Sequence, residues 1–149
     1  MSRAVLLDAG PLGLVTNPQR SPQSTACVQW LQGLILAGAD VFVPEIADYE
    51  VRRELLRANK TNGLARLDAL ARLLNYLPLT TAAFRQAALF WAQARQKGYP
   101  TANDKALDGD VILSAQAVTL GVADVIIATT NVDHLSHFAP ADVWQNIHV

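Results

Sequence analysis

Six acidic or amide side chains stand near the ends of predicted elements, in four separate parts of the chain. They are Asp8, Glu50, Asp108, Asp110, Asn131 and Asp133. Gathered carboxylates repel one another and raise their own pKa values, and a hard divalent cation removes that penalty. Ligand sets made only of oxygen select Mg²⁺ or Mn²⁺ rather than zinc or copper. Such a site can polarise a phosphodiester and activate water for its hydrolysis.

Each acid taken alone also has a structural interpretation. Asp110 heads an apolar, alanine-rich helical pattern, where a carboxylate can cap free N–H groups and interact favourably with the helix dipole. Asp8 could simply start a turn, and Glu50 could pair with Arg53 along its helix. The metal hypothesis therefore depends on whether the fold brings the four segments together.

Short apolar runs alternate with helical patterns, and these elements must position the acids. Strands are predicted at 4–7, 41–44, 76–79 and 125–128, with a last edge strand within 143–147. Helices are predicted at 24–36, 45–59, 65–74, 80–98 and 108–120, and a turn at 10–13. This alternation predicts a mostly parallel central sheet flanked by helices, in one α/β domain that covers residues 1–149.

A parallel sheet would gather the acids at one edge. Its strands all end at the same side, and ligands bind in the crevice outside that side. The first strand delivers Asp8 there, the second leads into the helix with Glu50, and the fourth delivers Asn131 and Asp133. The helix with Asp110 precedes the fourth strand, so a right-handed crossover turns its start toward the same edge.

Four motifs follow one another in this order along nearly the whole chain. They are Leu6-Leu7-Asp8, Tyr49-Glu50-Val51-Arg52-Arg53-Glu54-Leu55, Asp110-Val111-Ile112-Leu113-Ser114-Ala115-Gln116-Ala117 and Thr129-Thr130-Asn131-Val132-Asp133-His134-Leu135. In this pattern the chain resembles the PIN domain family of VapC-like toxin ribonucleases. The resemblance implies a single PIN-like domain and a Mg²⁺- or Mn²⁺-dependent ribonuclease. Asp8, Glu50 and Asp110 would be its catalytic metal ligands, and Asn131 would take the fourth position.

The chain departs from the family pattern at two places. Gly10 stands where members often have Ser or Thr, and His134-Leu135 replaces a closing Asp-Phe pair. Asp133 competes with Asn131 for the fourth position, and Asp108 is a further candidate ligand, directly or through water. These departures motivate an alternative function, a non-catalytic PIN module that binds RNA or protein. A small-molecule phosphohydrolase is a third hypothesis.

The resemblance also implies partners. The protein would be the toxin of a toxin–antitoxin pair, with an RNA substrate, a small antitoxin protein as partner and a homodimeric assembly. Arg52 and Arg53 begin a basic run beside the proposed site and are predicted to neutralise RNA phosphates, although such a run is commonly a solvated helix face. The net charge of −1 gives no global attraction to RNA, so any binding surface must be local.

Composition limits the remaining classes of protein. Hydrophobic residues make up 51% of the chain and charged residues 17%, which is typical of a globular domain. Cys27 is the only cysteine, which excludes an intrachain disulfide and a cysteine-based zinc cluster. The apolar run at 4–7 is too short for a signal peptide, and no run approaches the length of a membrane span. We therefore expect a cytoplasmic protein.

Overall fold

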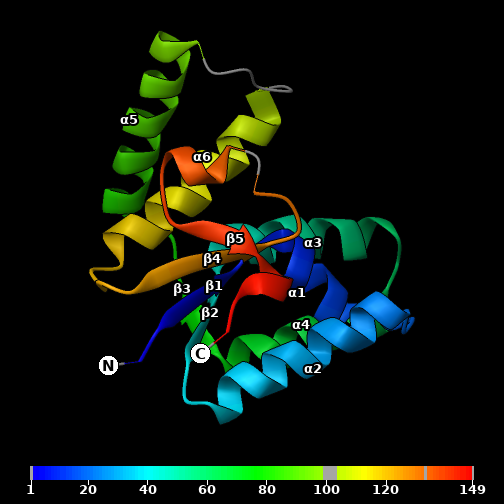
Figure 1. Ribbon diagram of the computed structural model, residues 1–149. Helices are drawn as coiled ribbons and strands as arrows, with labels where there is room; N and C mark the ends of the chain where they lie inside the picture. The colour runs from blue at the N-terminus through cyan, green and yellow to red at the C-terminus, as the bar shows by residue number, and fades with distance from the viewer. Residues whose placement is uncertain (1, 99–103, 133, 149) are drawn as a thin grey trace.

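The computed structural model describes residues 2–98, 104–132 and 134–148 (Figure 1). Along these residues the elements are β1 Ala4–Leu7, α1 Ala9–Thr16, α2 Pro22–Leu36, β2 Asp40–Pro44, α3 Glu45–Arg57, α4 Thr61–Leu73, β3 Asn75–Leu77, α5 Thr81–Lys97, α6 Asp104–Thr119, β4 Val125–Thr129 and β5 Ala141–Val143, with 3₁₀ turns at Leu135–His137 and Trp144–Asn146. The strands form one parallel sheet in the order β3-β2-β1-β4-β5. The predicted α/β fold, a parallel sheet flanked by helices, is confirmed.

Both faces of the sheet are covered, which explains the continuous apolar runs of its strands. Val5 and Leu7 of β1 pack into a core that includes Leu67 of α4 and residues of α1 and α2. Leu6, between them, points to the other face and belongs to a second core with Leu113 of α6. Figure 1 shows α2 and α4 on one side of the sheet and α6 on the other.

Helix α5 lies outside α6 and forms a third apolar cluster with it. The small side chains of Ala83, Ala87 and Ala94 face α6 and are buried. Phe84 and Trp91, on the same helix, remain 51% and 38% exposed. Both aromatic side chains therefore lie at the surface of the helix. None of the helices within the described ranges has the length and apolar character needed to cross a membrane.

The predicted turn at 10–13 is wrong, because this segment forms helix α1. Asp8 is its N-cap and accepts a hydrogen bond from the backbone N–H of Ala9 at 2.7 Å. Pro11 lies within the first turn, where its missing N–H costs no helical hydrogen bond. Leu12 and Val15 bury one side of the helix in the core. Turn-forming residue types were thus overridden by a cap and by tertiary burial.

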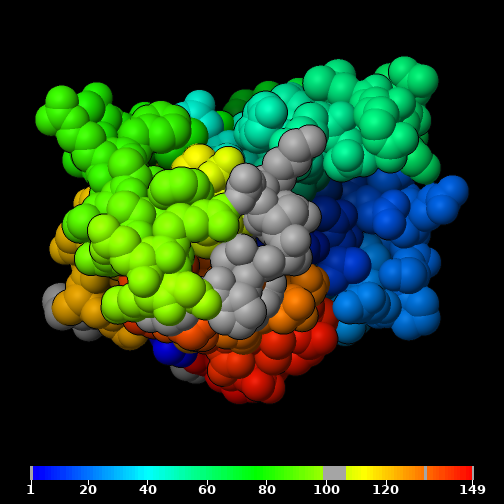
Figure 2. All heavy atoms as spheres, turned by 90° about the horizontal axis from the view of Figure 1, so that it is seen from above, coloured from blue at the N-terminus to red at the C-terminus, as the bar shows by residue number. Residues whose placement is uncertain are grey.

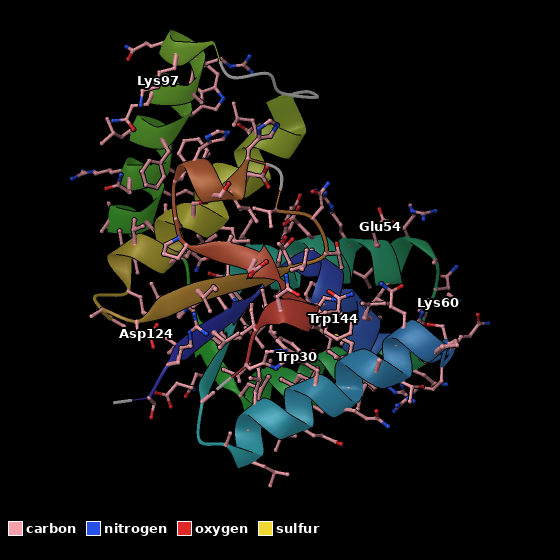
Figure 3. All side chains as sticks on the ribbon, in the orientation of Figure 1. Trp30, Glu54, Lys60, Lys97, Asp124 and Trp144 are labelled. Atoms are coloured by element: carbon pink, nitrogen blue, oxygen red, sulfur yellow. The ribbon has the colours of Figure 1, made fainter. Side chains whose placement is uncertain are left out.

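Two further boundaries differ from prediction. Helix α6 begins at Asp104, so Asp108 and Asp110 lie in its second turn rather than at its head. The predicted strand at 143–147 is instead the end of β5 followed by a 3₁₀ turn. Tertiary contacts explain this change, because the indole N–H of Trp30 donates to the carbonyl of Ile147 at 2.9 Å. The rings of Trp30 and Trp144 lie beside each other there (Figure 3).

Candidate metal centre

Asp8 lies directly after β1, at the carboxyl edge of the sheet. Its backbone N–H donates to the carbonyl of Ala128, which continues the pairing of β1 with β4 beyond Leu7. One carboxylate oxygen accepts from the N–H of Ala9 at 2.7 Å, and the other accepts from the hydroxyl of Thr129 at 2.8 Å. The carboxylate is therefore fixed from one side by the first residue of α1 and from the other by the last residue of β4.

Thr129 is a positioning residue that sequence reasoning missed. Its side chain is buried at the end of β4, and its hydroxyl accepts a hydrogen bond from the backbone N–H of Asn131 at 3.2 Å. The same hydroxyl donates to Asp8, so it links the first and fourth motifs of the sequence. Its role could have been predicted from its position. Thr129 ends a buried strand that pairs with the strand preceding Asp8.

Glu50 approaches the same place from α3. A Cβ built on Gly109 of α6 would lie only 3.1 Å from the Oε2 atom of Glu50, so the carboxylate rests against the backbone of that helix. Glycine at position 109 permits this approach. Asp110 is the next residue of α6 and is half-buried. The fold thus brings the second and third predicted acids to adjoining positions on packed helices.

The pKa values of Asp8 and Glu50 are raised, as expected for carboxylates that are gathered in one place. Burial raises the pKa of Asp8, and the hydrogen bonds from Thr129 and Ala9 act in the opposite direction. Burial also raises the pKa of Glu50, and the negative charge of Asp8 raises it further, against a lowering by Arg53. Both carboxylates are thus held in surroundings that disfavour their negative charge. A bound cation would relieve this penalty.

The chemistry of the donor set therefore fits a divalent metal, but the acids are not all assembled. Among the described residues there is no cluster of three or more His, Cys, Asp or Glu side chains arranged to hold a metal ion. Asn131 and Asp108 are exposed, at the end of β4 and in the second turn of α6. Asp133 lies outside the described residues. The described residues therefore bring together Asp8 and Glu50, and Asp110 adjoins Glu50 through Gly109.

A separate polar network anchors the helix that carries Glu50. Asp48, which is buried, accepts from the hydroxyl of Tyr76 at 2.6 Å and from Nε of Arg52 at 3.0 Å. Arg52 donates through another nitrogen to Asp68 of α4 at 2.8 Å. The network ties α3 to β3 and α4. Asp48 is therefore a tertiary anchor and makes no helix cap.

Two more hydrogen bonds hold the start of α3. The carboxylate of Glu45 accepts from the backbone N–H of Leu79 at 2.7 Å. The buried amide of Gln116, on α6, donates to the carbonyl of Leu77 at 2.9 Å and accepts from the N–H of Ile46 at 3.4 Å. The helices that bear Glu50 and Asp110 are thus joined through the end of β3.

The two arginines predicted to bind RNA have different surroundings. Arg52 is paired with two carboxylates, as described above, which gives it a structural role. Arg53 is exposed, and its guanidinium lies 5.1 Å from the centre of the Tyr49 ring. RNA binding by either residue stays a prediction.

A groove runs along α3 away from the acid pair. It has a volume of about 430 Å³ and lies between α3 and α1, from Ala9 and Glu50 to Arg57 and Lys60. Figure 2 shows α3 and α1 side by side on the face seen from above, opposite α5. Glu54 and Lys60 mark the outer part of this helix and the start of the next (Figure 3). An extended ligand bound in this groove would reach the carboxylate of Glu50.

Comparisons with known proteins support the fold. The sequence matches no family model and no curated protein. Solved structures do match over nearly the full chain. VapBC2 from Rickettsia felis, bound to a DNA fragment from its promoter, has a TM-score of 0.71 at 12% identity and covers 95% of this chain and 98% of that chain. FitAcB from Neisseria gonorrhoeae has a TM-score of 0.70 at 21% identity, with 96% and 99% covered.

A third match is VapBC-5 from Mycobacterium tuberculosis, a member of the VapBC family of toxin–antitoxin systems. Its TM-score is 0.57 at 18% identity, with 94% of this chain and 96% of that chain covered. At such identities the likeness is one of fold. This chain therefore has the VapC-like PIN fold that its motifs predicted, and its acid pair lies at the carboxyl edge of the sheet.

Proposed function

We propose that this protein is a Mg²⁺- or Mn²⁺-dependent ribonuclease and the toxin of a toxin–antitoxin pair. The observation that carries the proposal is the meeting of Asp8 and Glu50 at one sheet edge, with Asp110 adjoining and, among the residues that the structure describes, no arginine or lysine paired to Asp8. Structural acids are normally neutralised by a cation or by several hydrogen bonds. Asp8 and Glu50 instead lie close enough for their like charges to repel, and the hydrogen bonds to Asp8 and the charge of Arg53 offset the raised pKa values only in part.

Asp8, Glu50 and Asp110 would hold the cation, and Asn131, Asp133 or Asp108 would complete its ligands. A bound divalent cation would neutralise these acids, stabilise negative charge on a phosphodiester and lower the pKa of water. The chain's own part is positioning. Thr129 holds the carboxylate of Asp8, while the Asp48 network and Gln116 hold α3 and α6.

RNA would approach along the groove between α1 and α3. Lys60 and Arg57 line its outer end, and exposed Arg53 lies on the same helix as Glu50. These cations could contact phosphates while the acid pair receives the scissile bond. Their contribution to affinity should fall steeply with salt concentration.

The antitoxin, the homodimer and the cytoplasmic location remain parts of the proposal. The matched VapBC structures support the antitoxin, since VapBC-5 is a member of a family of toxin–antitoxin systems. The exposed apolar side chains of Phe84 and Trp91 on α5 suit a protein contact. Light scattering on the purified chain tests the homodimer. Co-expression with the product of the adjacent gene tests the antitoxin.

The first experiment is thermal unfolding with and without Mn²⁺, for wild type, Asp110→Asn and Glu50→Gln. A ligand that binds only the folded state stabilises it, by about 2.7 kcal/mol at one hundred times its dissociation constant. We expect Mn²⁺ to raise the melting temperature of wild type and of neither variant. Glu54→Gln is the matched control, because Glu54 lies one turn further along α3, exposed and paired with Arg57.

Cleavage of RNA is measured on the same four proteins. Wild type and Glu54→Gln should degrade RNA in Mn²⁺ and stop when EDTA is added, and the other two should be inactive. RNA binding without cleavage, and without any effect of Mn²⁺ on melting, would favour the non-catalytic PIN module. The incomplete cluster of acids among the described residues is the observation in favour of that alternative.

A further inference from the structure

Gly10 lies in the first turn of α1, two residues after Asp8. Its φ is not positive, unlike that of Gly38, Gly98, Gly121 and Asn59. Its backbone conformation therefore does not require glycine, and glycine disfavours a helix relative to alanine. Another constraint must account for it.

That constraint is the side chain of Thr130, at the end of the adjacent strand. A Cβ at position 10 would lie 2.5 Å from the Oγ1 atom of Thr130, 2.6 Å from Cγ2 and 3.1 Å from Cβ. Rotation about χ1 cannot clear this overlap. Two of the three staggered positions around the Thr130 Cβ overlap the added Cβ. Because Oγ1 and Cγ2 must fill two of the three positions, at least one of these atoms overlaps it in every rotamer. Gly10 therefore makes room for Thr130.

Thr130 is exposed and follows Thr129, whose hydroxyl bonds to Asp8. Its side chain is set against Gly10 in the first turn of α1, two residues after Asp8. Within the described part of the chain its hydroxyl makes no hydrogen bond. The carboxylates at this site can bind a cation but can donate no hydrogen bond to a phosphate. A hydroxyl can do so.

We propose that Thr130 is a substrate-binding residue whose hydroxyl donates a hydrogen bond to a phosphate oxygen of RNA at the acidic site. Position 10 is glycine because the side chain of Thr130 occupies the space that a side chain at position 10 would need. The inference rests on the proposed ribonuclease function and deepens it, since it assigns a phosphate contact to a residue outside the acid pair.

The test compares Thr130→Val with Thr130→Ser. Valine keeps the shape of threonine and removes the hydroxyl, and serine keeps the hydroxyl. Binding is measured by fluorescence anisotropy with a labelled single-stranded oligoribonucleotide, with Ca²⁺ in place of Mn²⁺ to neutralise the acidic site, and cleavage is monitored on the same samples. We expect Thr130→Val to weaken binding about tenfold, the usual loss for a hydrogen bond to a charged group. Thr130→Ser should bind as wild type does.

Kinetics with Mn²⁺ give a second readout on the same proteins. Thr130→Val should raise KM by a similar factor and leave kcat within about twofold, as expected for a group that binds ground state and transition state alike. If wild type cleaves RNA and Thr130→Val binds and cleaves it equally well, this proposal is wrong and the ribonuclease remains. If wild type neither binds nor cleaves RNA, the proposed function fails, and this proposal fails with it.

The packing argument has its own test that needs neither metal nor RNA. Gly10→Ala should lower the melting temperature by roughly 3–8 °C, the effect of an overpacked contact in a chain of this size. The double variant Gly10→Ala/Thr130→Ser should recover most of the loss, because a serine hydroxyl can rotate into the one uncrowded position. A Gly10→Ala variant as stable as wild type would overturn the assignment of Gly10.

Discussion

Two of the four acids on helix α3, Asp48 and Glu50, lie two residues apart in opposite surroundings. Asp48 is buried and faces the guanidinium of Arg52 and the hydroxyl of Tyr76. Glu50 is half-buried and lies near Asp8, a charge of the same sign, whose effect on the pKa outweighs the opposing charge of Arg53. The first acid is satisfied within the chain and stabilises the fold. The second is left for something that the chain alone does not supply, which is why we assign it to function.

The largest effect on stability should come from the satisfied acid. Asp48→Asn keeps the shape of the side chain, weakens its bond to Arg52 and removes its charge. We expect a loss of about 2 kcal/mol in the free energy of unfolding, as for buried hydrogen bonds to charged groups. Urea denaturation measures it. Tyr76→Phe removes one of the two hydrogen bonds to Asp48. A smaller loss of stability for this variant would confirm that both bonds contribute.

The opposite result is expected for the like-charged pair. Asp8→Asn and Glu50→Gln remove repulsion, so the metal-free protein should be as stable as wild type or more stable. Metal affinity should fall by at least about 10–100-fold, since even the loss of residues that only support ligands has that effect. Urea denaturation in EDTA and Mn²⁺ titration measure the two quantities. If both variants lose as much stability as Asp48→Asn, the contrast between the two acids disappears.

The pH dependence of stability sharpens the same comparison. The pKa values of Asp8 and Glu50 are raised in the folded state, mainly by burial. The folded protein therefore binds protons more tightly than the unfolded chain, whose carboxyl groups titrate near about pH 4. The stabilisation from these protons is complete below that pH and is lost as pH rises through the folded values.

Melting temperatures from pH 4 to pH 7 in EDTA check this expectation. Relative to the double variant Asp8→Asn/Glu50→Gln, wild type should lose stability as pH increases over this interval. Mn²⁺ should reverse that loss at the upper end, where the carboxylates are ionised. Parallel curves for the two proteins would mean that the pair carries no electrostatic penalty.

The smallest effect should come from an acid outside both groups. Glu54 is exposed and pairs with Arg57 three residues later. Exposed ion pairs are screened by water and contribute little to stability. Glu54→Gln should therefore leave the melting temperature and RNA cleavage unchanged within error. A measurable loss of cleavage would show instead that the groove along α3 uses this charge.

The sequence alone predicted the parallel sheet, four of its strands and the edge at which the acids lie. These features follow from local rules, since apolar runs mark buried strands and parallel strands end on one side. The same rules failed at the segment 10–13, where Gly10 and Pro11 indicated a turn but α1 formed. There the cap by Asp8 and the burial of Leu12 outweighed the residue types.

Only the tertiary structure decided which acidic residues stabilise the fold and which remain for a ligand. Asp48 and Glu50 lie on one helix with side chains about 200° apart around its axis, so they meet different neighbours. Those neighbours, Tyr76 on one side and Asp8 on the other, come from distant parts of the chain. Charge and spacing along a sequence indicate which groups can act. Whether a group is neutralised depends on partners that only folding brings near.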